Sequence, residues 1–269
     1  MPYSQKSFAD CLSTWLTVRC LNRKPKTQLF YRELHGLILK HWPDVALPAA
    51  ELSANTVLRL AASLAGVCCP SRWNAFVSFI RGISPHGKLR SRRRLNVRHF
   101  VPPSQAEFAA LLAECDAAPR SQAGLVVRFL AYTGLRISEA RALTWLHVFP
   151  DRIEVPAEST KSGKGRCVPR LAALDEVLIR LKGLDSGGFV LPRQNARKAI
   201  EQASKRALGS QWSYHSFRHL FATRCIESGV DMPTVARWLG HQDGGALLAK
   251  TYFHLVDEHS REMAARVSI

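Results

Sequence analysis

The stretch SYHSFRHLFATRC, residues 213–225, carries histidine and arginine side chains at helical spacing. His215 and Arg218 are three positions apart, so on a helix they share one face, where like charges destabilise an isolated helix. A guanidinium binds phosphate oxygens through paired hydrogen bonds, and a histidine with a pKa near about 6.5 can take or give a proton. The pattern indicates chemistry on a phosphate lying between them. His219 points about 100° away from Arg218 and is left out of the expected site.

The whole chain is strongly basic, with a net charge of +17 over 269 residues. Residues 1–98 contain 16 Lys and Arg against 4 Asp and Glu, a net charge of +12, and the remaining residues carry +5. An excess of this size repels itself unless an anionic partner neutralises it, and nucleic acid is the leading partner of that kind. A basic surface that only keeps the protein dissolved is the alternative that charge leaves open.

Composition excludes several classes of protein. With 46% hydrophobic residues the chain can bury a sizeable core, in one large domain or two ordinary ones. The seven cysteines are scattered and form no C-x-x-C pair, so neither a disulfide framework nor a zinc site is expected. No signal peptide is visible, and no apolar stretch reaches the roughly 18 residues of a membrane span. We expect a cytoplasmic protein that does not enter membranes.

The first part of the chain predicts short amphipathic helices separated by prolines. The helix around residues 71–83, for example, places Trp73, Phe76 and Ile80 on one side. We expect these helices to form an all-α domain of residues 1–85.

Residues 86–103 have no helical period and form the expected linker. They hold six basic residues: Lys88, Arg90, Arg92, Arg93, Arg94 and Arg98. A solvated spacer is one interpretation. We favour a strap that follows DNA phosphates, because clustered arginines gain most by neutralising a phosphate backbone.

A second domain, residues 104–269, begins with Ser104 and Glu107 in the spacing of a capping box. A further helix should end at Gly134, where a left-handed residue is expected. Residues 152–169 alternate like two strands around a Ser-Gly-Lys-Gly turn, which predicts a hairpin. The remainder has helical periodicity. The predicted fold class is mainly α, with an all-α N-terminal domain and a helical second domain that holds one small antiparallel sheet.

Five segments of this second domain occur in a specific order: YTGLRISEARALTW, TKSGKGRCVP, HSFRHLFAT, LGH and KTYFHL. Each alone is a weak signal, because short patterns of this kind arise by chance. In this order, and inside a basic chain of two domains, they resemble the tyrosine recombinase, or phage integrase, family. The motifs extend from Thr133 to Leu255, and the preceding helices match the family's core-binding domain by layout only.

The resemblance implies how a scissile phosphate would be held. Arg136 and Arg218 would bind it, and Glu139 would keep Arg136 in position, although an ordinary surface ion pair is the simpler explanation of Glu139. His215 would accept the proton of the attacking hydroxyl or contact the phosphate. His241, after a helix-ending glycine, would hydrogen-bond a non-bridging oxygen.

The resemblance also implies the two groups that exchange protons with the reacting oxygens. Lys161 would be the general acid for the departing 5′ oxygen, with Lys164 in the same turn as the alternative. Tyr252 would be the nucleophile, helped by cations that favour its phenolate. Tyr252 stands eleven positions after His241, an interval longer than the family commonly has, which places the loop geometry in question.

The implied activity is site-specific recombination or integration of DNA through a 3′-phosphotyrosyl intermediate, without ATP, metal or any cofactor. The implied partners are double-stranded DNA with paired target sites and further copies of the chain, as a tetrameric synapse on DNA and a monomer or weak oligomer when free. A bacterial or phage origin and a place on the nucleoid would follow. Three alternatives stay open: a relaxing topoisomerase of type IB, a regulator that only binds DNA through a helix-turn-helix, and a metal-dependent nuclease.

Overall fold

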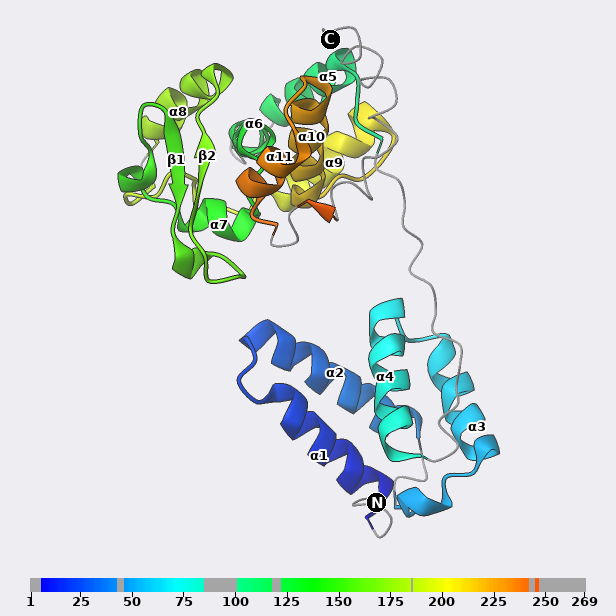
Figure 1. The fold of residues 1–269 in the computed structure, drawn as a ribbon. Coiled ribbons are helices and arrows are strands. Elements are labelled where there is room, and N and C mark those ends of the chain that lie inside the picture. The colour runs from blue at the N-terminus through cyan, green and yellow to red at the C-terminus, as the bar shows by residue number, and fades with distance from the viewer. Residues whose placement is uncertain are drawn as a thin grey trace, which may run out of the picture. The chain divides into compact units, whose positions relative to one another are not determined.

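The computed structural model of the chain describes residues 6–42, 46–84, 101–117, 122–184, 186–241 and 245–246. The chain divides into two compact units, Met1–Arg98 and His99–Ile269 (Figure 1). The six basic residues of the expected linker, Lys88 to Arg98, lie outside the described residues.

Unit 1, residues 1–98, is helical in its described part. Ser7 accepts a hydrogen bond from the Asp10 backbone at the start of its first helix, as its sequence favours. Trp73, Phe76 and Ile80 are all buried, which confirms that they share the core side of the last helix. The elements are α1 Phe8–Cys20, α2 Pro25–His41, the 3₁₀ helix η1 Ala49–Glu51, α3 Ala54–Ala65 and α4 Pro70–Ile83.

Unit 2, residues 99–269, combines helices with one small sheet. Its helices are α5 Gln105–Asp116, α6 Ala123–Thr133, α7 Ile137–Ala142, α8 Asp175–Lys182, α9 Arg197–Leu208, α10 Tyr214–Glu227 and α11 Met232–Leu239. Its strands are β1 Arg152–Val155 and β2 Arg166–Pro169, and its 3₁₀ helices are η3 Trp145–His147, η4 Ala157–Ser159 and η5 Ala172–Leu174. The prediction of a mainly α fold with a small antiparallel sheet is confirmed.

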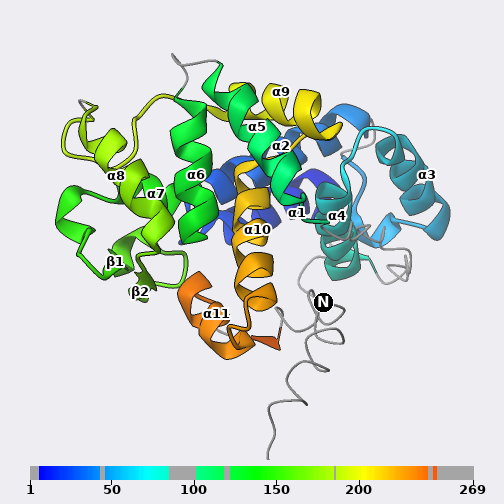
Figure 2. The same cartoon turned by 90° about the horizontal axis from the view of Figure 1, so that it is seen from above.

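Helix α6 lies at the centre of unit 2, and the ribbons of α6 and α10 run side by side in both views (Figures 1 and 2). The helix ends where predicted, at Gly134, whose φ of 63° is left-handed. A Cβ at this position would lie 2.4 Å from a ring carbon of Phe221 and 2.9 Å from a methyl carbon of Leu239. Glycine therefore lets the ends of α6 and α11 approach α10 closely.

The predicted hairpin and the predicted helix start of unit 2 are confirmed. Strands β1 and β2 pair antiparallel, with Arg152 opposite Pro169 and Val155 opposite Arg166. Ser104 and Glu107 form the expected capping box at α5. The hairpin holds its place because the inward side chains of Ile153 and Val168 are fully buried.

A membrane-crossing segment would need a long apolar helix, and the described residues contain none.

Candidate active site

Arg136 and Glu139 meet at the start of α7. Glu139 Oε2 accepts the backbone N–H of Arg136 at 2.9 Å, and Glu139 Oε1 accepts Arg136 Nη1 at 2.8 Å. Glu139 is fully buried, whereas the Arg136 side chain is 32% exposed. The burial rules out an ordinary surface ion pair. The buried carboxylate holds Arg136 from the side of the protein interior, and part of the Arg136 side chain faces solvent.

The Glu139 carboxylate also binds Arg166, the first residue of β2, which was not among the residues predicted from the sequence. Arg166 Nη1 and Nη2 donate to the two carboxylate oxygens at 3.1 and 2.7 Å. Burial alone would raise the pKa of Glu139, but the hydrogen bonds and charge of Arg166, together with those of Arg136, outweigh it and hold the pKa below its ordinary value. Glu139 is therefore a buried anion between two guanidinium groups.

Arg218 lies inside unit 2, with only 3% of its surface exposed. Its Nη1 donates to the carbonyl of Gly134 at 2.9 Å, and its Nη2 donates to the carbonyl of Leu239 at 2.6 Å. These carbonyls close the C-terminal ends of α6 and α11, where the helix dipole is negative and favours a cation. Because Gly134 and Leu239 each stand two residues before a predicted site residue, Arg218 brings the segments of Arg136 and His241 to one place.

His215 stands in the first turn of α10, and His219 lies against it. The two rings have centroids 4.8 Å apart in an edge-to-face arrangement. Part of His215 stays exposed to solvent, yet its pKa is lowered to about 4. The largest cause is desolvation by the surrounding protein, followed by repulsion between the protonated ring and His219, Arg218, Arg136 and His241. A pKa lowered in this way keeps His215 neutral at pH 7.

His219 thus adjoins the site although its sequence position next to Arg218 suggested a side chain turned away. Its distance of four residues from His215 already predicts a shared face. The pKa of His219 is also lowered, first by burial and then by the charge of Arg218.

Lys161 is exposed in the turn that joins β1 to β2. The neighbouring Thr160 donates its hydroxyl to the Ala157 carbonyl at 2.9 Å, and Gly163 takes a left-handed φ of 70° in the turn. Within the described residues, no hydrogen bond or ion pair joins Lys161 to the arginines or histidines of the site. Its link to them runs along the chain to Arg166.

His241 follows the left-handed Gly240 at the end of α11, as the sequence indicates. Its backbone N–H donates to the Ala236 carbonyl at 2.9 Å, which fixes where the histidine leaves the helix. Tyr252 lies outside the described residues, as does the segment around it.

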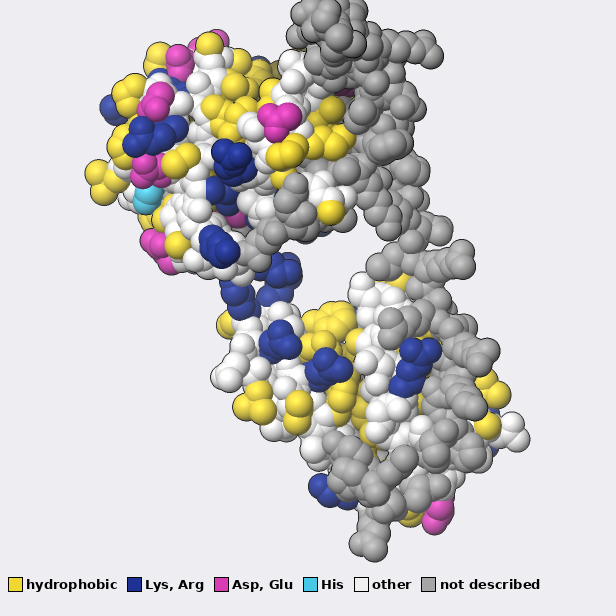
Figure 3. Space-filling view, in the orientation of Figure 1, with side chains coloured by type: hydrophobic (Ala, Val, Ile, Leu, Met, Phe, Trp, Pro, Cys, Tyr) yellow, Lys and Arg dark blue, Asp and Glu magenta, His cyan; other side chains and the backbone are white. Residues whose placement is uncertain are grey.

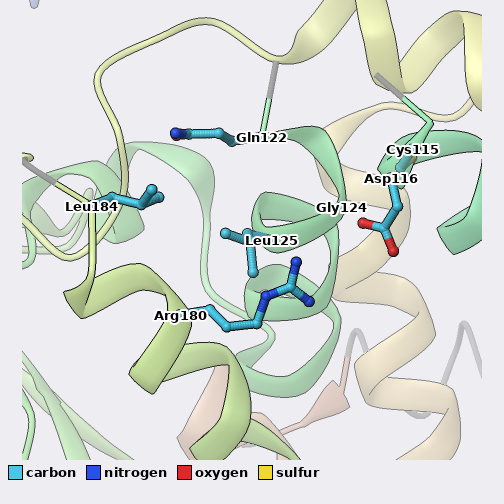
Figure 4. Close-up of a pocket in the computed structure, with 7 residues that line it drawn as sticks. All are labelled: Cys115, Asp116, Gln122, Gly124, Leu125, Arg180 and Leu184. Atoms are coloured by element: carbon cyan, nitrogen blue, oxygen red, sulfur yellow. The ribbon is translucent and has the colours of Figure 1, made fainter. Parts of the chain in front are cut away.

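One cavity of about 340 Å³ lies apart from these residues, near the start of α6 and the end of α5 (Figure 4). It is lined by Cys115, Asp116, Gln122, Gly124, Leu125, Arg180 and Leu184. The eleven residues of α6 span about 16 Å between this cavity and Gly134. The candidate site is therefore a cationic surface at the C-terminal end of α6 and does not include this cavity.

Comparison with known proteins gives the family of this arrangement. The profile of the Phage integrase family matches residues 104–259, more than half of the chain. The chain belongs to the phage integrase family. It is 32% identical over 158 residues to the integrase of Haemophilus phage HP1, covering 58% of this chain and 44% of that protein. It is 33% identical over 193 residues to tyrosine recombinase XerD of Corynebacterium glutamicum, covering 62% of this chain and 61% of that protein.

The chain thus spans about half the length of the curated relatives it matches. Solved structures of integrases share its fold. A Tn1549 transposon integrase in complex with a circular intermediate DNA has a TM-score of 0.76 at 15% identity, covering 98% of this chain and 100% of the other. A lambda integrase dimer bound to a COC′ core site has a TM-score of 0.71 at 16% identity, covering 88% and 96%. At this identity the likeness concerns the fold.

Proposed function

We propose that this chain is a site-specific DNA recombinase that cleaves and rejoins strands through a phosphotyrosyl intermediate, with Tyr252 as nucleophile. The observation that carries the proposal is the position of Arg218. Its two bonds to helix-ending carbonyls bring together the segments of Arg136 and His241, beside His215 on its own helix. Membership of the phage integrase family supports the same activity.

The electrostatics of the site suit an attack on a phosphodiester. Arg136 presents a partly exposed guanidinium whose geometry matches two phosphate oxygens, and the buried Arg218 adds positive charge from inside unit 2. His241 donates a further hydrogen bond to a non-bridging oxygen. Together these groups stabilise the charge that builds on the pentavalent phosphorus.

Two proton transfers accompany the exchange of bonds at phosphorus. The Tyr252 oxygen forms a bond to phosphorus and releases its proton to His215, whose neutral ring at pH 7 can accept it. The bond from phosphorus to the 5′ oxygen breaks, and Lys161 supplies the proton that this oxygen takes. The phosphodiester bond energy is kept in the tyrosyl ester and returned on religation, so the scheme contains no step for ATP or a metal ion.

Double-stranded DNA is the proposed substrate, and a tetramer of this chain on two paired target sites is the proposed assembly. Unit 1 supports the choice of DNA by its net charge of +12. Lys and Arg side chains are spread over the face of unit 1 seen in Figure 3, where acidic side chains are sparse. The six basic residues at the end of unit 1, Lys88 to Arg98, are proposed to bind further along the phosphate backbone.

The test uses a nicked duplex from which the short fragment carrying the 5′ hydroxyl diffuses away after cleavage. We expect the wild-type chain to accumulate a protein–DNA adduct that survives boiling in detergent, in chelator and without ATP. Tyr252→Phe removes only the attacking oxygen, so it should bind the duplex and form no adduct. An adduct in Tyr252→Phe would place the nucleophile elsewhere, and wild type without an adduct would contradict the proposed function.

A further inference from the structure

Arg166 differs from Arg136 because it cannot easily reach a ligand. Its side chain is 7% exposed, against 32% for Arg136. Three of its nitrogens donate to groups of unit 2: two bind the Glu139 carboxylate, and Nε donates to the carbonyl of Trp238 at 2.7 Å. The side chain is therefore committed to bonds within the protein.

The first consequence of these bonds concerns charge. Glu139 pairs with both Arg136 and Arg166, so one negative charge stands against two positive charges. With Arg136 as its only partner, Glu139 would neutralise the guanidinium that faces solvent. Because Arg166 supplies the second cation from inside, the group of three keeps a net positive charge, and Arg136 can be held in place without losing its pull on an anion.

The second consequence concerns the turn that carries Lys161. Arg166 is the first residue of β2, five positions after Lys161, and so fixes the point where this turn rejoins the sheet. Its side chain passes along Gly240, where a Cβ would lie 3.0 Å from Arg166 Cδ. One side chain therefore joins the base of the Lys161 turn, the Glu139 carboxylate and the end of α11 that precedes His241.

We propose that Arg166 is a positioning residue that sets the Lys161 turn against Arg136 and His241, an inference that rests on the proposed function. In the described part of the chain, no hydrogen bond or ion pair of Lys161 itself reaches those two residues. The alignment of the general acid then depends on Arg166, together with its partner Glu139.

The test compares two substrates that differ only in the leaving atom. The first carries the ordinary 5′ oxygen, and the second carries a 5′ sulfur, whose thiolate departs without a proton. The ratio of the sulfur rate to the oxygen rate, measured in single turnovers, reports how well Lys161 delivers its proton. Both rates come from one preparation, so a fraction of unfolded protein cancels in the ratio. Lys161→Ala gives the upper limit of the ratio and wild type gives the lower.

Arg166→Met keeps the length of the side chain and removes its charge and donors. We expect cleavage of the oxygen substrate to fall about 10²-fold, because a small misplacement of a catalytic group can cost that much. The ratio should rise to between the wild-type and Lys161→Ala values. A ratio equal to that of wild type would overturn the proposal, even if both rates fall, because Lys161 would then be correctly placed.

Arg170→Met is the matched control at the other end of the same hairpin. Arg170 Nε donates to Asp175 at 2.7 Å, and its Nη1 donates to the Phe149 carbonyl at 3.1 Å, so it also bonds a carboxylate and a carbonyl. None of these partners belongs to the site. We expect the ratio to stay at the wild-type value, and a rise equal to that of Arg166→Met would overturn the specific role of Arg166.

The double variant Glu139→Gln with Arg166→Met separates positioning from folding. Arg166→Met leaves the buried Glu139 carboxylate with the partly exposed Arg136 as its single cationic partner, whereas the double variant buries no carboxylate there. The double variant should therefore be more stable in urea than Arg166→Met, while its ratio stays high. A ratio that returns to wild type with the stability would mean that Arg166 only balances charge, and the proposal would be wrong. Wild type that forms no adduct on the oxygen substrate would instead contradict the proposed function.

Discussion

The two units of the chain treat charge in opposite ways. Among the described residues of unit 1, Ser84 is the one buried polar residue, at 7% exposure. The charged side chains of unit 1 that the structure describes are on or near the surface. Unit 2 has the smaller net charge, +5, yet it buries Glu139 and Arg218 almost completely. Most of the net charge therefore belongs to unit 1, whereas the described residues of the candidate site belong to unit 2. Charge spread over a surface attracts any polyanion, whereas charges fixed inside a fold can meet one phosphate in one geometry.

The largest effect expected from this contrast follows the loss of the deepest positive charge in unit 2. Arg218→Met should slow single-turnover cleavage about 10²–10³-fold, because it removes positive charge beside the developing anion, and loss of one stabilising group typically has an effect of this size. It should also lower the free energy of unfolding by about 1.5–3 kcal/mol for each of the two hydrogen bonds to Gly134 and Leu239. Urea unfolding measures this loss. A variant of wild-type stability would show that the two helix ends do not depend on Arg218.

The next effect concerns the basic residues at the end of unit 1. Replacing Arg92, Arg93 and Arg94 with Ala should make the dependence of DNA affinity on salt less steep. The slope of log K against log salt should change by about 0.9 for each phosphate that is no longer neutralised. Binding titrations at several salt concentrations measure the slope, and the intrinsic cleavage rate at saturating protein should change little. An unchanged slope would reduce this segment to a spacer.

A smaller effect is expected from pH. The pKa of His215 is about 4 in the folded chain and 6.5 in its ordinary state, so between these values the unfolded chain binds more protons. Stability should therefore fall as pH drops from 6.5 toward 4. His215→Gln should lose less stability than wild type over this interval, as measured by urea unfolding at pH 7 and pH 4.5. Equal losses would mean that the His215 pKa is near its ordinary value.

The smallest effect belongs to an ion pair of unit 1. Arg72 and Glu33 pair with side chains that are 31% and 46% exposed. Pairs of this kind contribute about 0.2–1 kcal/mol, because water screens them and their side chains lose freedom. Arg72→Ala should therefore change the free energy of unfolding by no more than about 1 kcal/mol. A loss as large as that of Arg218→Met would remove the distinction between the units.

What the sequence could predict was mostly local. The capping box of Ser104 and Glu107, the left-handed Gly134 and the hairpin from Arg152 to Pro169 each follow from neighbouring residues. Turn and cap chemistry acts over a few positions, so a single sequence contains the information. Hydrophobic periodicity likewise predicted the core side of α4 and, with the hairpin, the mainly α fold.

The contacts of the site that the sequence did not predict join residues that are far apart in the chain. Arg166 binds Glu139 across 27 positions and Trp238 across 72, and no periodicity indicates such partners. Arg218 was expected to bind a phosphate, and the structure adds that it closes two helix ends. His219 was left out of the expected site because its direction was judged from its neighbour Arg218. Its spacing of four residues from His215 would have placed it on the same face. The roles of Lys161 and Tyr252 remain predictions.

The charges of Arg136, Glu139 and Arg166 also affect how this chain can evolve. A replacement of Glu139 alone leaves two guanidinium groups facing each other, and a replacement of Arg166 alone leaves the carboxylate with Arg136 as its single partner. The first intermediate leaves two cations without a counter-charge, and the second leaves a buried carboxylate without the two hydrogen bonds of Arg166, so either one costs stability. Drift at these positions should therefore proceed by paired substitutions, or only in backgrounds that are stable enough to tolerate one unfit step. Libraries that vary Glu139 and Arg166 one at a time should miss functional combinations that a joint library contains.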